Sequence, residues 1–380
     1  MKRIFKNHFQ PALLPAFILI FFTLLWAGCK KHDFPKELKD FEQVNLLSNS
    51  TSYGAAHIDQ NLLNAWGLAF SPGGIAWVNA HDGHLSFVLD KDGNSLRAPV
   101  NIPSHGSQTG GEPTGIVFNG TTDFKLSNGN PAAFIFVGED GILSGWNGPR
   151  GNFAAEIKDH SDKAGYTGLA IGVSGGKNFI YAADFKEHQI KIWDGNFNAV
   201  SMSFKDPGIP SDFSPFNIQN VSGKLYVMYA KVSSEGDEIK GPGLGYVSVF
   251  NTDGSLVSRF ASAGTLNAPW GVAWAPASFF ADEENNNGNG NPSGYSKTGS
   301  DANQDRILVG NFGDGRINVF DLNGNFIGQL KRHGQPIVIE GLWALMFPPA
   351  TATTVDPNRL YFAAGPNDEK DGLFGYIIKK

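Results

Sequence analysis

Short apolar segments separated by polar, glycine-containing turns fill almost the whole chain. The stretch from residue 267 to 325 shows the repeating order most completely. An apolar segment entered through a Pro-Trp-Gly sequence is followed by two more, at 306–312 and 316–321, and an Asx-Gly pair follows each of these two. Short runs rich in β-branched and aromatic residues, bounded by Gly and Asn, predict strands. Strand, strand, tight turn, strand, tight turn is the order expected for one blade of a β-propeller.

The same unit recurs six times, which predicts an all-β, six-bladed β-propeller over residues 41–380. Successive units begin about 48 to 54 residues apart, with about 72 residues across the fifth. Pairs such as Asp92-Gly93 and Asp253-Gly254 are expected to form two-residue turns in which both central residues take positive φ. The six units open at Asn64, Glu112, Tyr166, Pro215, Asn267 and Glu340.

The two ends of the repeat region are incomplete in a complementary way. The chain stops after the third strand of the sixth unit, and the apolar segment Phe41–Ser50 precedes the first unit without belonging to it. We expect this N-terminal strand to pair with the last blade and close the ring, because an open ring would leave strand edges exposed. The polar segment Asp282–Asp305 lacks the calcium-loop pattern and is expected to be a flexible insertion.

The N-terminal residues have the features of a bacterial lipoprotein signal. Lys2, Arg3 and Lys6 precede an apolar run at 11–26, and small residues precede Cys29, the only cysteine. This order predicts a signal peptide over residues 1–28, a lipid-modified Cys29 and a polar tether over residues 29–40. The protein is then exported and anchored to the membrane of the cell envelope, at the outer membrane. The alternative is an uncleaved anchor helix, for which the apolar run is slightly short.

Composition supports this assignment and excludes one class of partner. The chain contains 47 glycines, 12% aromatic residues and only 17% charged residues, which favours a β fold. Its net charge is −6, and removal of the signal peptide would delete only basic residues. An acidic chain without basic clusters argues against nucleic-acid binding.

Several long phrases of the sequence carry a resemblance to a known family. They include residues 64–72, 113–119, 215–220, 308–315 and 341–345. In these the chain resembles an uncharacterised family of exported bacterial six-bladed propellers, over roughly residues 46 to 378. The resemblance implies the fold and export, but no established activity. More distantly, the Pro-Trp-Gly-Val-Ala sequence at 269–273 is similar to strand openings in NHL-repeat and TolB-like propellers and in calcium-dependent lactonases and phosphotriesterases.

Polar residues that precede first strands or follow second strands are expected to meet at one end of the central channel, because these positions share one face of a propeller. His81 also falls in this set, although a histidine near a hairpin is often only a surface turn residue. The candidate binding residues at this channel mouth are Asn64, Trp66, Asn79, Glu112, Thr114, Glu139, Asp184, Asn217, Lys231, Trp270, Asn311, Glu340, Trp343 and Asn367.

Two interpretations of these residues stay open. Converging carboxylate and amide oxygens are ligands that Ca²⁺ prefers, and a bound metal could activate water for hydrolysis. Alternatively, Asn and Thr near strand ends bond to the main chain, and the tryptophans fill the channel. The candidate metal ligands are Glu112, Asp184, Asn217, Asn311 and Glu340.

No complete catalytic set is recognisable in the sequence. The nine histidines lack metal-ligand spacing, no nucleophile motif is present, and Cys29 lies outside the propeller. We therefore favour a non-catalytic module that binds a small molecule, a glycan or a partner protein at the channel mouth. The alternative is a calcium-dependent hydrolase of the lactonase or phosphotriesterase type.

We predict that the mature protein begins at Cys29 and that its sulfur carries a diacylglycerol group. Mass spectrometry of the N-terminal peptide from membrane fractions checks this. A peptide that still begins with Met1 would contradict the prediction.

Overall fold

The computed structural model describes residues 38–281 and 304–380. The predicted signal peptide, Cys29, most of the predicted tether and nearly all of the predicted insertion lie outside the described residues. Within the described ranges no helix has the length and apolar character needed to cross a membrane.

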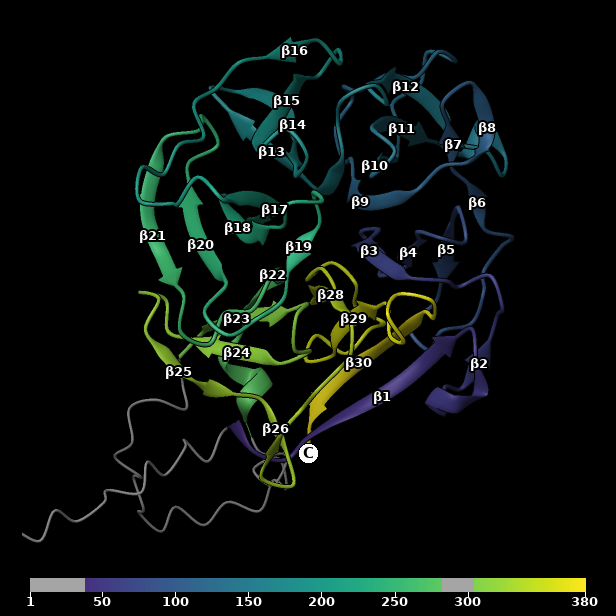
Figure 1. Cartoon of the computed structure of the whole chain (residues 1–380). Helices are drawn as coiled ribbons and strands as arrows, with labels where there is room; N and C mark the ends of the chain where they lie inside the picture. Colours follow the sequence, from purple (N-terminus) through teal and green to yellow (C-terminus); the bar gives the residue numbers. More distant parts are fainter. Residues whose placement is uncertain (1–37, 282–303) are drawn as a thin grey trace, which may run out of the picture. The chain divides into compact units, whose positions relative to one another are not determined.

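Six sheets, antiparallel apart from the short β1–β2 pair at the edge of the last, are arranged in a ring, which confirms the predicted six-bladed propeller (Figure 1). Blade one contains β3 (Ala65–Phe70), β4 (Ala76–Ala80), β5 (Leu85–Leu89) and β6 (Val100–Asn101). Blade two contains β9 (Pro113–Phe118), β10 (Phe134–Gly138), β11 (Ile142–Trp146) and β12 (Ala155–Asp159). Blade three contains β13 (Tyr166–Ser174), β14 (Lys177–Asp184), β15 (Gln189–Asp194) and β16 (Ala199–Val200).

The second half of the ring follows the same order with two additions. Blade four contains β17 (Phe213–Val221), β18 (Lys224–Val232), β20 (Gly245–Phe250) and β21 (Leu256–Ser262), and β19 (Glu238–Ile239) pairs with β18. Blade five contains β22 (Pro269–Ala275), β23 (Arg306–Asn311), β24 (Ile317–Phe320) and β25 (Phe326–Gln329). Blade six contains β28 (Leu342–Met346), β29 (Leu360–Ala364), β30 (Leu373–Lys379), β1 (Phe41–Ser48) and β2 (His57–Ile58).

The N-terminal strand closes the ring, as predicted. β1 runs antiparallel to β30, with Phe41 opposite Lys379 and Ser48 opposite Leu373. The Phe41 ring packs on Phe279, with ring centroids 4.9 Å apart. The last blade is therefore built from both ends of the propeller region. Pairing with β1 covers the edge of β30 that would otherwise be open.

The Asx-Gly turns differ from the expected two-residue type. Gly93 and Gly254 take positive φ, but the aspartates before them do not. In the first of these turns the carboxylate of Asp90 accepts the main-chain N–H groups of Asp92 and Asn94, both at 2.9 Å. An Asx turn thus holds the longer loop in place, and only its glycine needs the left-handed conformation.

Every inner strand bulges at the same place, close to its beginning. The register of β3 with β4 breaks between Ala65 and Leu68, and corresponding breaks occur in the other five blades. A glycine follows the bulged residue in four blades, and a Cβ on Gly67 would lie 2.1 Å from the Thr114 oxygen of the next blade. The bulged residues, which we call the neck ring, are Trp66, Thr114, Thr167, Phe216, Trp270 and Trp343.

The neck ring fills the centre of the propeller. Each of its six side chains is at most 4% exposed. Trp343 contacts the rings of both Phe216 and Trp270, from blades four and five, and the Trp270 indole N–H donates to the Thr167 oxygen of blade three at 3.0 Å. The Pro-Trp-Gly sequence is therefore primarily a packing motif. The neck ring as a whole separates the two ends of the channel.

We predict that deletion of residues 41–50 abolishes cooperative unfolding, because β30 would lose its whole β1 partner strand. Thermal unfolding followed by circular dichroism measures this. A synthetic peptide of residues 38–50 added in trans should restore the transition. A deletion variant that melts at the wild-type temperature would contradict ring closure by β1.

Candidate functional site

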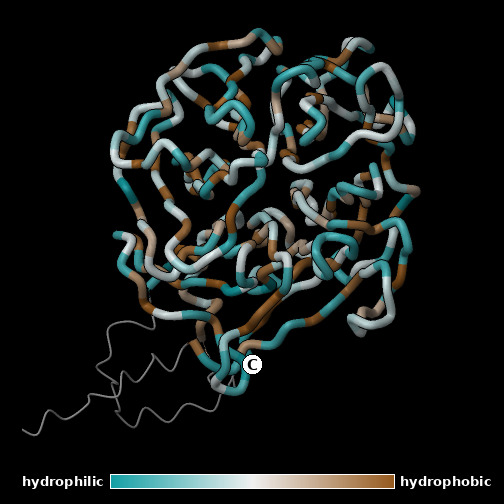
Figure 2. The backbone as a smooth tube through the Cα atoms, in the orientation of Figure 1, coloured by the Kyte–Doolittle hydropathy of each residue, from teal (hydrophilic) through white to brown (hydrophobic). Residues whose placement is uncertain are grey.

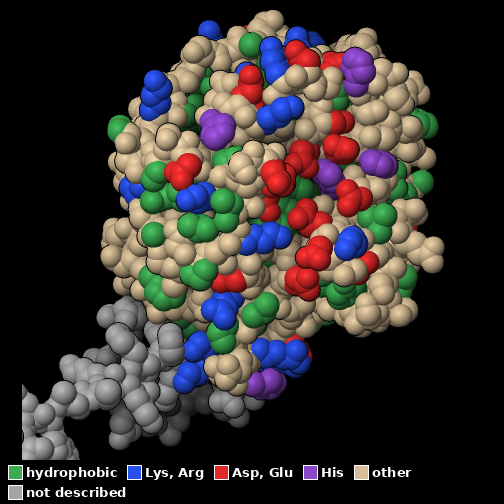
Figure 3. All heavy atoms as spheres, in the orientation of Figure 1, with side chains coloured by type: hydrophobic (Ala, Val, Ile, Leu, Met, Phe, Trp, Pro, Cys, Tyr) green, Lys and Arg blue, Asp and Glu red, His purple; other side chains and the backbone are tan. Residues whose placement is uncertain are grey.

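One end of the channel is surrounded by carboxylates. At this end the inner strands begin and the second strands finish, and Asp and Glu side chains gather over the middle of the ring (Figure 3). We call this end the acidic mouth. Its acidic residues come from blades one, two, four and six and are Asp82, Glu112, Glu139, Asp140, Glu238 and Glu369.

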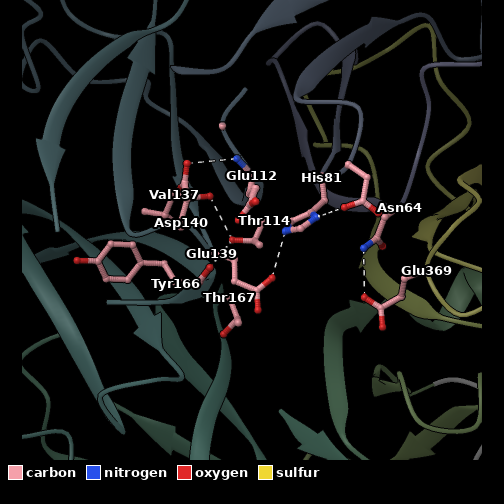
Figure 4. Close-up of polar contacts among 12 residues, drawn as sticks. Asn64, His81, Glu112, Thr114, Val137, Glu139, Asp140, Tyr166, Thr167 and Glu369 are labelled. Atoms are coloured by element: carbon pink, nitrogen blue, oxygen red, sulfur yellow. Dashed lines mark hydrogen bonds and ion pairs between the residues drawn. The ribbon is translucent and has the colours of Figure 1, made fainter. Parts of the chain in front are cut away.

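His81 is held between two of these carboxylates. It follows β4 and is only 8% exposed. Its Nδ1 lies 2.7 Å from Asp82 Oδ1, and its Nε2 lies 3.1 Å from Glu139 Oε2 in blade two (Figure 4). Burial by itself lowers the pKa of His81, but the hydrogen bonds to Asp82 and Glu139 outweigh burial and raise it to about 10. His81 is therefore an imidazolium at neutral pH, and in this state it cannot accept a proton as a general base.

Three other carboxyl groups at the mouth hold their protons more tightly than usual. Burial raises the pKa of Glu238 to about 7, and the nearby charge of Glu369 adds to this effect. Burial also raises the pKa of Asp140 to about 6, and it raises the pKa of Glu369. Burial is the largest cause of these shifts and neighbouring carboxylates add to it, so a bound cation would favour the ionised forms of these groups.

Beneath these carboxylates, aromatic rings from three blades form a continuous stack. Phe312 stacks on Trp343 with centroids 3.8 Å apart, and Trp343 stacks on Trp66 at 3.6 Å. Trp66 in turn lies against the ring of His81 at 5.3 Å. At the other end the ammonium of Lys240 lies 4.2 Å from the Phe312 centroid. This ring stack therefore has a cation at each end, an arrangement stabilised by the negative faces of the rings.

The ring stack is also tied to the acidic mouth by hydrogen bonds. The Trp343 indole N–H donates to Asn64 Oδ1 at 2.9 Å, and Asn64 Nδ2 donates to Glu369 Oε2 at 3.2 Å (Figure 4). Two polar atoms of the neck ring, Trp66 Nε1 and Thr167 Oγ1, are buried without a hydrogen-bond partner in the described part of the chain. Such atoms are costly when buried alone, so the neck ring gives up some stability at these two positions.

Three of the predicted binding residues instead join neighbouring blades. Asn79 Nδ2 donates to the Thr114 oxygen at 3.2 Å. The Thr114 hydroxyl donates to the Tyr166 oxygen at 2.6 Å, and Asn217 Nδ2 donates to the Trp270 oxygen at 2.8 Å. These contacts support the structural interpretation of the buried Asn and Thr residues.

Two further candidates organise turns. Asn311 donates to the Thr265 oxygen at 2.8 Å and accepts the N–H of Asn267 at 3.1 Å. Asp184 is fully buried, and its Oδ1 accepts the N–H groups of Gly165 and Glu187, both at 3.1 Å. Burial raises the pKa of Asp184, and its Oδ2 has no partner among the described residues.

The other candidates lie at the rim. Lys231 pairs with Asp212 at 3.1 Å. Glu340 accepts the N–H of Asn367 at 3.1 Å, and the Asn367 side chain donates to Asp371 at 3.2 Å.

Four of the five predicted metal ligands are engaged with the main chain, and the fifth, Glu112, lies at the acidic mouth, so a calcium site formed by these residues stays a prediction. Asp184, Asn217 and Asn311 already bond to the main chain, as described above, and Glu340 does so through Asn367. Over residues 38–281 and 304–380, no group of three or more His, Cys, Asp or Glu side chains is placed to hold a metal ion.

Sequence reasoning missed several residues of the acidic mouth. Glu238 and Lys240 belong to the segment 233–244, where blade four departs from the repeat by adding β19, and this departure was the available signal. Asp140 and Glu369 lie in turns before third strands, where acidic residues are common for structural reasons. His81 is buried against Trp66 rather than exposed at a turn.

The opposite end of the channel is apolar. It contains a cavity of about 200 Å³ whose walls include Leu68, Ile116, Leu169 and Ile218 from the inner strands of four blades. Trp270 of the neck ring also lines this cavity. The channel is thus acidic at one end and apolar at the other.

We predict that the His81 ring stays protonated until about pH 10, and that Glu139→Gln lowers its pKa by about 1–3 pH units by removing a neighbouring negative charge. Ring ¹⁵N chemical shifts followed against pH measure both values. The stabilisation by charged His81 is complete below pH 6.5 and is lost as the pH rises through about 10. The exposed Glu156 provides the control Glu156→Gln, which should leave His81 unchanged. A wild-type ring that titrates near pH 6.5 would contradict this geometry.

Comparison with known proteins gives relatives of similar length, although no family model matches the chain. Uncharacterized protein L690 of Acanthamoeba polyphaga mimivirus is 34% identical over 349 residues, which cover 89% of this chain and 86% of that protein. Uncharacterized protein R648 of the same virus is 32% identical over 89% of this chain and 80% of its own length. Both are viral proteins, so the predicted membership of an exported bacterial family stays a prediction.

Among solved structures, virginiamycin B lyase from Staphylococcus aureus matches 90% of this chain and 99% of its own, with a TM-score of 0.48 and 13% identity. A gluconolactonase from Xanthomonas campestris matches 64% of this chain and 82% of its own, with a TM-score of 0.33 and 13% identity. No activity is transferred at this level of similarity. The sequence identity does establish the family: the chain belongs to the one that includes the mimivirus proteins L690 and R648.

Proposed function

We propose that this propeller is a non-catalytic module that binds a small organic cation at its acidic mouth. The observation that carries the proposal is the position of Lys240, whose ammonium lies 4.2 Å from the Phe312 centroid and 4.0 Å from Glu238 Oε1. An ammonium group therefore has a suitable place at this mouth, with an aromatic face on one side and a carboxylate on another. A ligand with an ammonium or guanidinium group attached to an apolar body has the matching chemistry.

Both the aromatic ring stack and the carboxylates of the acidic mouth contribute to recognition of such a ligand. A cation over an aromatic face gains about 0.5–2 kcal/mol, more when water is excluded. The carboxylates of Glu139, Glu238 and Glu369 influence one another electrostatically, so they surround a common region of negative charge.

A calcium-dependent hydrolase of the lactonase or phosphotriesterase type is the second candidate. Six carboxyl groups at one mouth favour a cation of some kind, and carboxylate oxygens are the ligands that Ca²⁺ takes. Against it, the pKa of His81 is raised to about 10, so this histidine is not available as a neutral base at pH 7. Elemental analysis together with a lactone and phosphoester screen separates the two candidates. Stoichiometric calcium with chelator-sensitive hydrolysis would favour the hydrolase.

The cellular setting follows from the signal-peptide prediction. We propose that the tethered propeller presents its mouth outside the cytoplasm, with the lipid on Cys29 as its membrane partner. A glycan or a protein could present the same cationic group as a small molecule, because the carboxylates and the ring stack recognise only that group.

Titration with benzyltrimethylammonium tests the proposal, with tryptophan fluorescence and calorimetry as readouts. We expect saturable binding, no binding of the uncharged benzyl alcohol, and a loss of about tenfold in affinity, or about 1.4 kcal/mol, for Glu139→Gln or Glu369→Gln. Glu156→Gln is the matched control because it removes a charge from the edge of blade two. Absence of binding, or equal weakening by the control, would contradict the proposal.

The pH dependence of this binding gives an independent check, because benzyltrimethylammonium has a fixed charge. Asp140 and Glu238 lose their protons near pH 6 and pH 7, respectively. We therefore predict that affinity rises from pH 5 to pH 8 and then levels off. An affinity that is flat over this interval would show that these carboxyl groups do not contribute.

A further inference from the structure

Lys240 directly follows β19, a strand that blade four alone among the described blades adds between its second and third strands. In this blade, residues 233–244 separate the second and third strands, and β19 folds back on the end of β18. Ile239 pairs with Lys231, and Glu238 pairs with Val232. Val232 packs against the hydrophobic core cluster that includes Phe312 and Trp343. The β18–β19 hairpin is therefore fixed at its base, and it carries Lys240 to the mouth.

The contacts of Lys240 are those expected of a cationic ligand. Its ammonium faces Phe312 at the end of the ring stack and lies 4.0 Å from Glu238 Oε1. Its positive charge also favours the ionised form of Glu369, the carboxylate bonded to Asn64. Lys240 thus partly neutralises the part of the mouth in which an incoming cation would be most stable.

The side chain is nevertheless held only weakly. It is 44% exposed, and its distance to Glu238 is at the upper limit for an ion pair. The exposed ammonium gains little from a pair of this length, since water solvates it and a long side chain loses entropy when it is fixed. Lys240 can therefore leave the Phe312 face without disturbing the main-chain pairing of β19.

We propose that Lys240 is a tethered competitor that occupies the cation position of the mouth and is displaced when a ligand binds. This inference rests on the proposed function and adds a means of selection to it. A cationic ligand replaces the lysine charge beside Glu238 and Glu369, so the site exchanges one cation for another. A neutral ligand that displaced Lys240 would leave these carboxylates without a counter-charge, and the exchange would be unfavourable.

The test compares Lys240→Met with Lys177→Met in the full-length protein. Methionine keeps an unbranched apolar side chain but removes the charge. Lys177 is exposed at the start of β14, whose other end reaches the mouth, so its substitution makes the same change in net charge at the opposite face. Unchanged melting temperature and circular dichroism establish that both variants are folded. Affinity for benzyltrimethylammonium is then measured by calorimetry at pH 8.

We expect Lys240→Met to bind benzyltrimethylammonium about tenfold more tightly than Lys177→Met, because the internal competitor is gone. Wild-type protein that fails to bind while Lys240→Met binds would overturn the proposed function of the wild-type protein, because Lys240 would then block the site permanently instead of exchanging with a ligand. Equal affinities of the two variants would overturn the competitor role but leave the acidic mouth as a binding site. Weaker binding by Lys240→Met would also overturn it, because Lys240 would then assist the ligand. No binding by any of the three proteins would overturn both proposals.

A second measurement observes the displacement itself. Reductive ¹³C-methylation keeps the lysine charge and gives each lysine an NMR signal, and Lys240→Met identifies the signal of Lys240. Ring current from Phe312 should shift this signal upfield, and saturating benzyltrimethylammonium should return it to the position of an exposed lysine. A signal that stays shifted at saturation would contradict displacement.

Discussion

The close approach of the six inner strands at the neck of the channel is the constraint on which the rest of the structure depends. A Cβ on Gly67 would lie 2.1 Å from the Thr114 oxygen, and a Cβ on Gly168 would lie 1.9 Å from Asn217 Oδ1. Bulges at this level direct one side chain from each blade toward the others. Side-chain amides and indoles then bond to the main chain of neighbouring blades, so the neck acts as one packed layer.

The neck ring also explains why the two ends of the channel differ in chemistry. Its aromatic members continue through Phe312 and His81 into the ring stack, which forms the base of the acidic mouth. Beyond the ring, the inner strands present Leu, Ile and Val side chains, and the cavity there is apolar. Charge is thus concentrated at one end, where burial raises the pKa of Glu238 and Asp140 and two internal cations partly neutralise it.

Much of the fold could be predicted because its determinants are local in the sequence. Strand period, Asx-Gly turns and the unpaired segment at 41–50 together gave six blades and ring closure by β1. The exact turn geometry was missed, because the Asp90 carboxylate stabilises a longer loop that the Asp-Gly pair alone does not reveal. Strand polarity also placed Asn64, Glu139 and Trp343 toward the same end of the channel.

The chemistry of the mouth was harder to predict because it depends on distant partners. The state of His81 is set by Glu139, and Asn64 meets Glu369 across the closure of the ring. Asn79 and Asn217 resembled ligand residues, yet each bonds to the main chain of the next blade, which no local pattern indicates. Lys240 reaches the mouth only because β19 pairs with β18, an addition that breaks the repeat.

A crystal structure with 4-bromobenzyltrimethylammonium shows directly whether the acidic mouth and its ring stack hold an organic cation. We expect an anomalous bromine peak at the mouth, with the ammonium between Phe312 and Glu369 and with Lys240 moved away from the Phe312 face. A bromine peak confined to the apolar cavity at the opposite end, or no peak at saturating concentration, would contradict this expectation.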